Sequence, residues 1–369
     1  MSSLSGQTYI SDYFNNCPIE TLYLGRNIDY STESYLLRHP FANNSSLTSV
    51  SIGNSVTNIK DGAFGGCQNL TSLTIGNSVA SIGSDAFKGC YSLTSVTIPS
   101  SVTTIGGSAF YGCNLKEVEF HLNTIGTWFR DFQSIQKITL GEEVTSIGGY
   151  AFSGCSGLTS IEIPNGLTII GENAFSGCSG LTSIEIPNCV TSMGENAFSG
   201  CSGLTTVIIG NGVKSIGNST FYNCSGLTTV TIGDGVKSIG KKAFLGCTSL
   251  TSIEIPSSLT SIGDDAFQGC IGITVIDLPN RMNSIGQNAF SGCSGLTTLS
   301  LPNSMTSIGN NAFYGCTNLE SVNSEITDVF SINAFEEGCD AILYVPFGTK
   351  LTYIQTPGWN VFRDVLKIN

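Results

Sequence analysis

The chain has 369 residues, a formal net charge of -12, and only 11% charged residues. This acidic balance excludes binding to nucleic acid or an anionic membrane through a basic field, and leaves proteins, glycans and cations as partner classes. No run approaches the roughly 18 apolar residues of a membrane helix, and the first ten residues show no secretory signal. We therefore expect no membrane insertion, and a cytoplasmic location stays open on this evidence.

Residues 1–46 are irregular in sequence and are predicted to form an N-terminal capping region. The first apolar rung is Ile19, Leu22 and Leu24. The end of a stacked core must be covered by a terminal unit, because otherwise its first apolar face would meet water.

A repeat of about 23 residues organises residues 47–325. The segment that begins Leu158-Thr-Ser-Ile-Glu-Ile-Pro starts again at Leu181. A fixed period of this size is typical of a solenoid, because one unit is too small to enclose a core and buries its apolar side against its neighbours. The sequence therefore predicts stacked coils, each one repeat long, instead of several globular domains.

Each coil is predicted to contain one strand and one short helical turn on opposite faces. In the coil that begins at Leu158, the last positions of the Leu-x-x-Ile-x-Ile pattern alternate as in a strand, which Pro164 ends. A second short apolar segment closes with Gly171. Ala174, Phe175 and Cys178 then follow at a spacing that places them on one face of a helical turn. The predicted inward side chains of this coil are Leu158, Ile161, Ile163, Leu167, Ile170, Ala174, Phe175 and Cys178.

Eleven of the fourteen cysteines, from Cys67 to Cys316, occupy one position of the repeat. The two interpretations of this column are a metal-binding or redox site and simple packing in the core. Packing is favoured, because the cysteine shares one face of the coil with an Ala and a Phe that recur at the same spacing in the other coils. Neighbouring coils are close enough for disulfides, but a continuous column gives no reason to pair. We expect these thiols to be buried and reduced, and Cys189, which lies outside the column, to be the most exposed thiol. The Gly before each column cysteine, replaced by Asn223 in one coil, predicts a left-handed turn.

The coil at residues 115–134 is shorter by about three residues. Trp128-Phe129 replaces Ala-Phe, and His121 replaces the Pro or Gly that ends the strand elsewhere. We expect a kink or irregular patch here. Because this coil is unlike the others, His121, Trp128, Arg130 and Asp131 are predicted to form a binding site. The alternative is that Trp128 fills space left by the missing residues.

Outward strand positions are predicted to form a polar ladder that includes Glu162, Glu185, Glu254 and Asp277. Paired acids are also used by glycosidases, but an open sheet offers no pocket that would separate the two pKa values. A calcium site would need six or more oxygens. We therefore predict a solvated binding face with no catalytic residue, no metal site and no cofactor; a carboxylate-dependent glycan hydrolase is a remote alternative.

Residues 326–369 depart from the repeat. Tyr353, Trp359 and Phe362 are aromatic residues at irregular spacing. This segment is predicted to be a C-terminal capping region.

The Leu-Thr-Ser-Ile-Glu-Ile-Pro and Ile-Gly-x-x-Ala-Phe-x-Gly-Cys motifs strongly resemble those of the BspA-like (treponemal-type) leucine-rich repeats. The resemblance covers about residues 44–325 and implies a leucine-rich-repeat solenoid, an α/β horseshoe-like but β-rich fold with a parallel β-sheet on one face. It also implies a non-enzymatic bacterial protein, at the cell surface or secreted, that adheres to a protein or glycan ligand such as a host extracellular or microbial surface component. A structural spacer, or a fragment of a larger surface protein, is the alternative.

Overall fold

The computed structural model describes residues 17–27 and 39–367, and the chain divides into two compact units, residues 1–145 and 146–369. Each unit is a parallel β-solenoid in which every coil contributes a strand to a main sheet and, in most coils, a two-residue strand to a second row. The leucine-rich-repeat solenoid expected from the sequence is therefore present in each unit.

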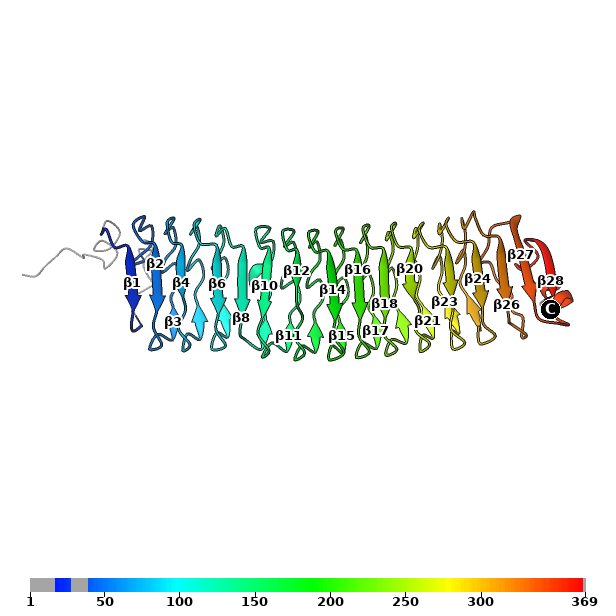
Figure 1. The fold of residues 1–369 in the computed structure, drawn as a ribbon, viewed down its shortest axis with the longest axis horizontal. Helices are drawn as coiled ribbons and strands as arrows, with labels where there is room; N and C mark the ends of the chain where they lie inside the picture. The colour runs from blue at the N-terminus through cyan, green and yellow to red at the C-terminus, as the bar shows by residue number, and fades with distance from the viewer. Residues whose placement is uncertain (1–16, 28–38, 368–369) are drawn as a thin grey trace, which may run out of the picture. The chain divides into compact units, whose positions relative to one another are not determined.

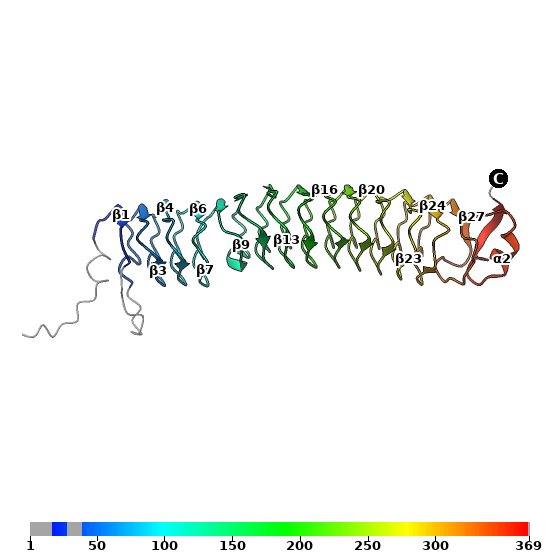
Figure 2. The ribbon, with the colours of Figure 1, turned by 90° about the horizontal axis from the view of Figure 1, so that it is seen from below.

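In the first unit, the main-sheet strands lie side by side in chain order (Figure 1). They are β1 (Thr21–Leu24), β2 (Ser49–Ile52), β4 (Ser72–Thr74), β6 (Ser95–Ile98), β8 (Glu117–Phe120) and β10 (Lys137–Leu140). The second row contains β3 (Asn58–Ile59), β5 (Ser81–Ile82), β7 (Thr104–Ile105) and β9 (Thr124–Ile125). Figure 2 shows the two rows on opposite sides of this unit.

The short coil does not disturb the main sheet of the first unit. Strand β8 pairs with β6 and with β10 over four aligned residues each, so Val118 lies opposite both Val96 and Ile138. The coil is shortened at two places. Three residues join β8 to β9, whereas five join β6 to β7, and after β9 a 3-10 helix, η1 (Thr127–Phe129), replaces the usual turn. The loss of residues is therefore absorbed in the connection from β8 to β9 and in the turn that follows β9.

In the second unit, the main-sheet strands also follow chain order, and two longer strands end the sheet (Figure 1). They are β12 (Ser160–Ile161), β14 (Ser183–Ile186), β16 (Thr206–Ile209), β18 (Thr229–Ile232), β20 (Ser252–Glu254), β22 (Val275–Asp277), β24 (Thr298–Leu301), β26 (Ser321–Ser324), β27 (Cys339–Val345) and β28 (Phe362–Lys367). The second row contains β11 (Ser146–Ile147), β13 (Ile169–Ile170), β15 (Ser192–Met193), β17 (Ser215–Ile216), β19 (Ser238–Ile239), β21 (Ser261–Ile262), β23 (Ser284–Ile285) and β25 (Ser307–Ile308).

The helical turns expected at the Ala-Phe segments are not formed in the described repeats. Asn173 and Gly177 have φ values of 53° and 75°, and a residue in the left-handed region interrupts a right-handed helix. The N–H groups of Asn173, Phe175 and Gly177 instead donate to carbonyls of the next coil at 2.7–2.9 Å. The segment is a succession of turns that is hydrogen-bonded to the same segment of the next coil. These inter-coil bonds satisfy its backbone N–H groups better than a single helical turn would.

The left-handed turn predicted before each column cysteine is confirmed. Gly177 and its equivalents have φ values of 72–79°, and Asn223 has a φ of 55°. Every side chain predicted to face inward in the coil at Leu158 is buried except Ile163, which is half-buried.

Columns of identical side chains run through the core of the second unit. Phe175 stacks on Phe198 with ring centroids 5.2 Å apart and planes 4° apart, and Phe198 stacks on Phe221 at 5.5 Å. Beside this column the cysteines form a second one, in which the thiol of Cys201 donates to the carbonyl of Phe175 at 3.2 Å. The same bond recurs in the neighbouring coils. Each coil is therefore tied to the one before it through its core as well as through its sheets.

Aromatic residues of the C-terminal segment cover the last coil of the second unit. The ring of Phe335 meets Phe362 edge-on at 4.8 Å and Trp359 at 6.3 Å. The Trp359 indole N–H donates to the carbonyl of Phe330, and the Tyr353 hydroxyl, from α2 (Lys350–Gln355), donates to the carbonyl of Ile326, each at 2.8 Å. The polar ends of both aromatic rings are thus satisfied where they are buried.

Candidate binding surface

The outward side chains of the main sheet in the second unit form in-register columns. Glu185 of β14 lies opposite Ile208, which lies opposite Thr231, which lies opposite Glu254 of β20. Glu185 and Glu254 are exposed, and Ile208 is 42% exposed. Farther along, Asp277 starts a second column that continues through Ser300, Asn323 and Tyr344. The sequence thus identified the outward-facing positions correctly.

The acids of the main sheet lie along its open outward face. Glu185 and Glu254 are three strand spacings apart, or about 14 Å, whereas hydrolytic carboxylate pairs lie within about 5–9.5 Å. Glu162 is exposed and directly follows β12. Glu162 stands one repeat before Glu185, so these two acids belong to neighbouring coils. The arrangement suits contact with an extended surface, since the acids are exposed on an open sheet face.

His121 lies between two carboxylates at the end of β8. Its Nδ1 is 2.8 Å from Oε1 of Glu143, and its Nε2 is 3.2 Å from Oε1 of Glu119. Thr97 donates to the other Glu119 oxygen at 3.1 Å. The Glu143 carboxylate accepts a hydrogen bond from the backbone N–H of Glu143 and also interacts with His121. These contacts hold the pKa of Glu143 below its usual range. The result is a surface network that links three successive coils of the first unit.

The other residues predicted from the short coil lie on the far side of it. Trp128 belongs to η1 and is half-buried, with its ring against the backbone of Gly126. The Arg130 Nε is 3.5 Å from Oδ2 of Asp131, and both side chains are exposed. Because η1 follows the second row (Figure 2), these residues and His121 occupy different sides of the first unit. Packing in the core falls mainly to Phe129, which is fully buried against Phe110.

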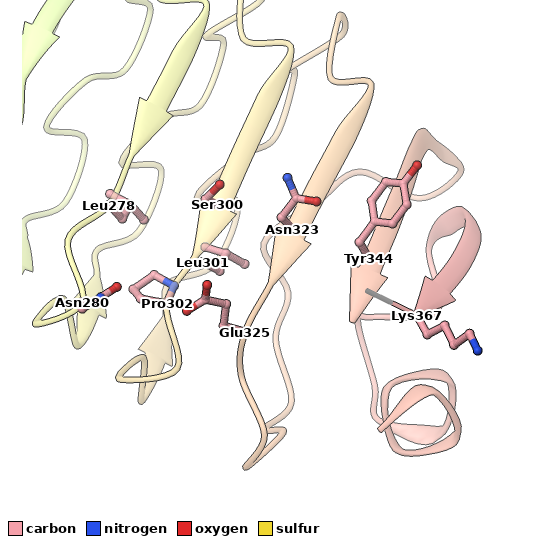
Figure 3. A pocket seen from close by; sticks show the side chains of 9 residues that line it. All are labelled: Leu278, Asn280, Ser300, Leu301, Pro302, Asn323, Glu325, Tyr344 and Lys367. Atoms are coloured by element: carbon pink, nitrogen blue, oxygen red, sulfur yellow. The ribbon is translucent and has the colours of Figure 1, made fainter. Parts of the chain in front are cut away.

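A pocket that the sequence did not reveal lies on the main sheet of the second unit, near the carboxyl ends of its last strands. Its volume is about 430 Å³. We call it the Tyr344 pocket, and its lining residues are Leu278, Asn280, Ser300, Leu301, Pro302, Asn323, Glu325, Tyr344 and Lys367 (Figure 3). The volume is in the range of about 300–1,000 Å³ that small-molecule sites occupy.

The pocket exists because side chains change along the outward column. Ser300 and Asn323 are short, whereas the next position in register is Tyr344, whose ring stands beside Asn323 as a wall (Figure 3). Leu301 and Pro302 are buried and form an apolar floor. A wider depression of about 800 Å³ lies on the other side of Tyr344 and includes Arg363. The Tyr344 ring thus borders two adjoining hollows.

The two charged side chains that line the Tyr344 pocket, Glu325 and Lys367, point in different directions. The Lys367 ammonium lies over the Phe347 ring, 5.8 Å from its centroid, and Figure 3 shows it directed away from Glu325. The Glu325 carboxylate instead lies beside Leu301 and Pro302. The pocket therefore presents one carboxylate, with Lys367 contributing its aliphatic stem to the wall.

The cysteines do not form a reactive site among the residues that the structure describes. All the column thiols are buried and free, Cys189 is half-buried, and no group of His, Cys, Asp or Glu side chains in those ranges could hold a metal ion. Burial raises the pKa of Cys67, Cys224 and Cys316 to about 12. A thiol held protonated is a poor nucleophile and a poor metal ligand, so the column serves packing.

The stacked coils, parallel sheets and inward Leu, Ile and Phe residues define a leucine-rich-repeat solenoid protein. Residues 7–129, 123–251 and 237–368 match the family model described as "BspA type Leucine rich repeat region (6 copies)". The chain belongs to this family. Comparison with curated proteins finds no match.

Solved structures of bacterial repeat proteins are similar to this chain. A leucine-rich repeat protein from Bacteroides ovatus is 28% identical, with a TM-score of 0.58 over 86% of this chain and 92% of that one. A leucine rich cell surface protein from Faecalibacterium prausnitzii is 28% identical, with a TM-score of 0.42 over 84% and 89%. The leucine-rich repeat protein of T. pallidum is 31% identical, with a TM-score of 0.32 over 37% and 73%. The first likeness supports the fold. Among residues 17–27 and 39–367, no helix has the length and apolar character needed to span a membrane.

Proposed function

We propose that this protein is a non-enzymatic binding scaffold that holds a protein or glycan ligand on the main sheet of its second unit. The observation that carries the proposal is the in-register outward column from Glu185 to Glu254, in which Glu185, Ile208 and Glu254 are exposed, on a sheet whose inward side chains are mostly buried in the core. Extended solenoid faces of this kind bind through area and complementarity.

Membership of the BspA-type family supports a location at the bacterial cell surface or outside the cell, where such a face would meet host or microbial components. The ligand contacts proposed on the main sheet of the second unit are Glu162, Glu185, Glu254 and Asp277. His121 is a separate candidate contact on the main sheet of the first unit. Trp128, Arg130 and Asp131 are a separate candidate contact on the far side of the first unit. Catalysis is not part of the proposal, because Glu162 and Glu185 are both exposed on an open sheet face, which provides no enclosed environment that would separate their two pKa values.

Binding to immobilised extracellular-matrix proteins and to a glycan array tests this function. The double change Glu185→Lys and Glu254→Lys reverses two charges on the face and should weaken any binding found with the unmodified protein by about tenfold or more, since like-charge contacts cost several kcal/mol. Asp265→Lys is a matched control away from the main sheet, because Lys242 already occupies the equivalent left-handed position, with φ of 57° against 54°.

Three outcomes would contradict the proposal. Equal losses in the double variant and in Asp265→Lys would show that charge in general, and not the sheet face, controls binding. Absence of binding to every protein and glycan tested would favour the structural spacer. Turnover of a glycan that disappears in Glu162→Gln or Glu185→Gln would favour the hydrolase.

A further inference from the structure

We propose that the Tyr344 pocket is a carbohydrate-binding subsite that takes one pyranose ring of a neutral glycan, with an apolar face of the sugar against the Tyr344 ring. This inference rests on the proposed function and names the ligand class for one end of the binding face. The argument uses the chemistry of the pocket walls, the charge they present, and the backbone beneath them.

Hydrogen-bonding groups of both kinds face the pocket without a protein partner. The side chains of Ser300, Asn323, Glu325 and Tyr344 form no hydrogen bond or ion pair with other described residues. The Asn323 amide and the Ser300 and Tyr344 hydroxyls can each donate and accept, whereas the ionised Glu325 only accepts. A ligand whose own groups both donate and accept satisfies this set best. Sugar hydroxyls do so, while phosphate oxygens only accept and ammonium groups only donate.

The apolar parts of the pocket complement a sugar ring as well. Leu301 and Pro302 form the floor and the Tyr344 ring forms one wall, so a flat ligand with C–H groups on one face would bury them there. The C–H edges of a pyranose carry a partial positive charge, and the face of an aromatic ring is negative, so contact between them is favourable. A purely polar ligand would leave this surface unmatched.

Charge selects a neutral ligand over an anionic one. The exposed Glu325 carboxylate lies beside Leu301 and Pro302, while the Lys367 ammonium lies over Phe347 and points away from the pocket. An acidic sugar or a phosphate would therefore approach a carboxylate without a facing cation, and in a partly enclosed site such a contact is unfavourable.

The backbone beneath the pocket does not favour a peptide strand. Strand β24 pairs with β22 and β26, β26 pairs with β24 and β27, and β27 pairs with β26 and β28. The pocket therefore lies over a face with no free edge, and a peptide could not extend the sheet there through its main chain. Recognition must use side chains and shape, which is the way a saccharide is held.

An array of neutral oligosaccharides ending in hexoses or N-acetylhexosamines tests the inference. The unmodified full chain should bind at least one of them. Tyr344→Ala should weaken that binding on the order of tenfold, because it removes the ring contact. Tyr344→Phe keeps the ring and should lose no more than about fivefold, the value of one neutral hydrogen bond. Tyr314→Ala is the matched control, since Tyr314 is 49% exposed and lies outside the pocket.

Asn323→Ala and Glu325→Gln provide a second measurement if Tyr344→Ala changes the melting temperature, and each should also weaken glycan binding. Glycan binding that is unchanged in all three pocket variants would overturn the inference and leave the proposed function intact. The same holds if the protein binds only immobilised proteins, or only acidic sugars or basic peptides. If it binds no ligand of any class, both the inference and the proposed function fail.

Discussion

Alkaline pH should unfold the second unit through its column of buried thiols. Burial raises the pKa of Cys224 and Cys316 to about 12, against an ordinary value of 9.0, and raises the pKa of five further column thiols. Those five are Cys178, Cys201, Cys247, Cys270 and Cys293. In the native protein these groups keep their protons at a pH where an unfolded chain would release them.

The sign and size of the effect follow from proton linkage. Because the folded pKa is raised, the stability that each thiol contributes is fully present below pH 9 and is lost as the pH rises from about 9 toward 12. In that window each thiol lowers the free energy of unfolding by about 1.4 kcal/mol per pH unit. Seven thiols together lower it by about 10 kcal/mol per unit, since seven times 1.4 is about 10. That is comparable with the whole stability of a typical domain, about 5–15 kcal/mol, so unfolding is expected near pH 10.

Urea unfolding followed by circular dichroism, in the presence of a reductant and between about pH 8 and pH 10, measures this dependence. Cys224→Ala should reduce the slope of the free energy of unfolding against pH by the contribution of one thiol, about 1.4 kcal/mol per pH unit. Cys189→Ala, outside the column, should leave the slope unchanged. A stability that stays constant across this range, or an undiminished slope in Cys224→Ala, would refute the reasoning.

Four other predictions follow from the same structure. A thiol reagent should modify Cys189 before Cys201 in the native protein, as mass spectrometry of digested samples would show; rapid labelling of Cys201 would mean that the column faces solvent. Phe221→Ala should lower the free energy of unfolding by about 3–5 kcal/mol, because it empties one ring position of the stack, and a loss under about 1 kcal/mol in urea melts would contradict this. Lys242→Asn should raise that free energy by about 0.5–1 kcal/mol, because asparagine accepts the left-handed backbone more readily, and a decrease would speak against it. Arg130→Ala should weaken partner binding without lowering the melting temperature; unchanged binding would remove the far side of the short coil from the candidate surface.

The sequence was sufficient to predict the main sheet and the core. Leu158 and Ile161 recur with a period that only stacked strands satisfy, and the structure buries both. The second row was missed because a strand such as Ile169–Ile170 has only two residues, too few to show an alternating pattern.

The Ala-Phe segment shows why the helical turn was wrongly predicted. Ala174, Phe175 and Cys178 have helical spacing, but the left-handed residue before Ala is Asn173 in one coil, Tyr150 in another and Lys242 in a third. In most coils this residue is a Gly, Asn or Asp, which adopts the conformation readily, but Tyr150 and Lys242 have no such preference. At Tyr150 and Lys242 the backbone N–H donates to the next coil at 2.8 and 2.9 Å, and such inter-coil bonds are visible only once the coils are stacked.

Some residues of the candidate surfaces could be predicted from the sequence and others could not. Glu185 and Glu254 could be assigned outward positions from alternation alone, and the structure agrees. The carboxylates that flank His121 could not be predicted, because Glu143 reaches it only through the register of the next coil. The Tyr344 pocket was missed because its wall and rim come from strands β27 and β28, which no repeat pattern describes.

The repeated contacts of the second unit make its length adjustable in whole steps. Phe175, Phe198 and Phe221 are interchangeable partners in the stack, and each coil is bonded to coils 23 residues away on either side. Excision of residues 181–203 would join Gly180 to Leu204 and bring Phe175 against Phe221 with the same geometry. Recombination between such near-identical gene segments would therefore yield folded variants whose sheet differs by one strand, about 4.8 Å, per event. The number of strands in the sheet of the second unit can therefore change while the side chains that form its core stay the same.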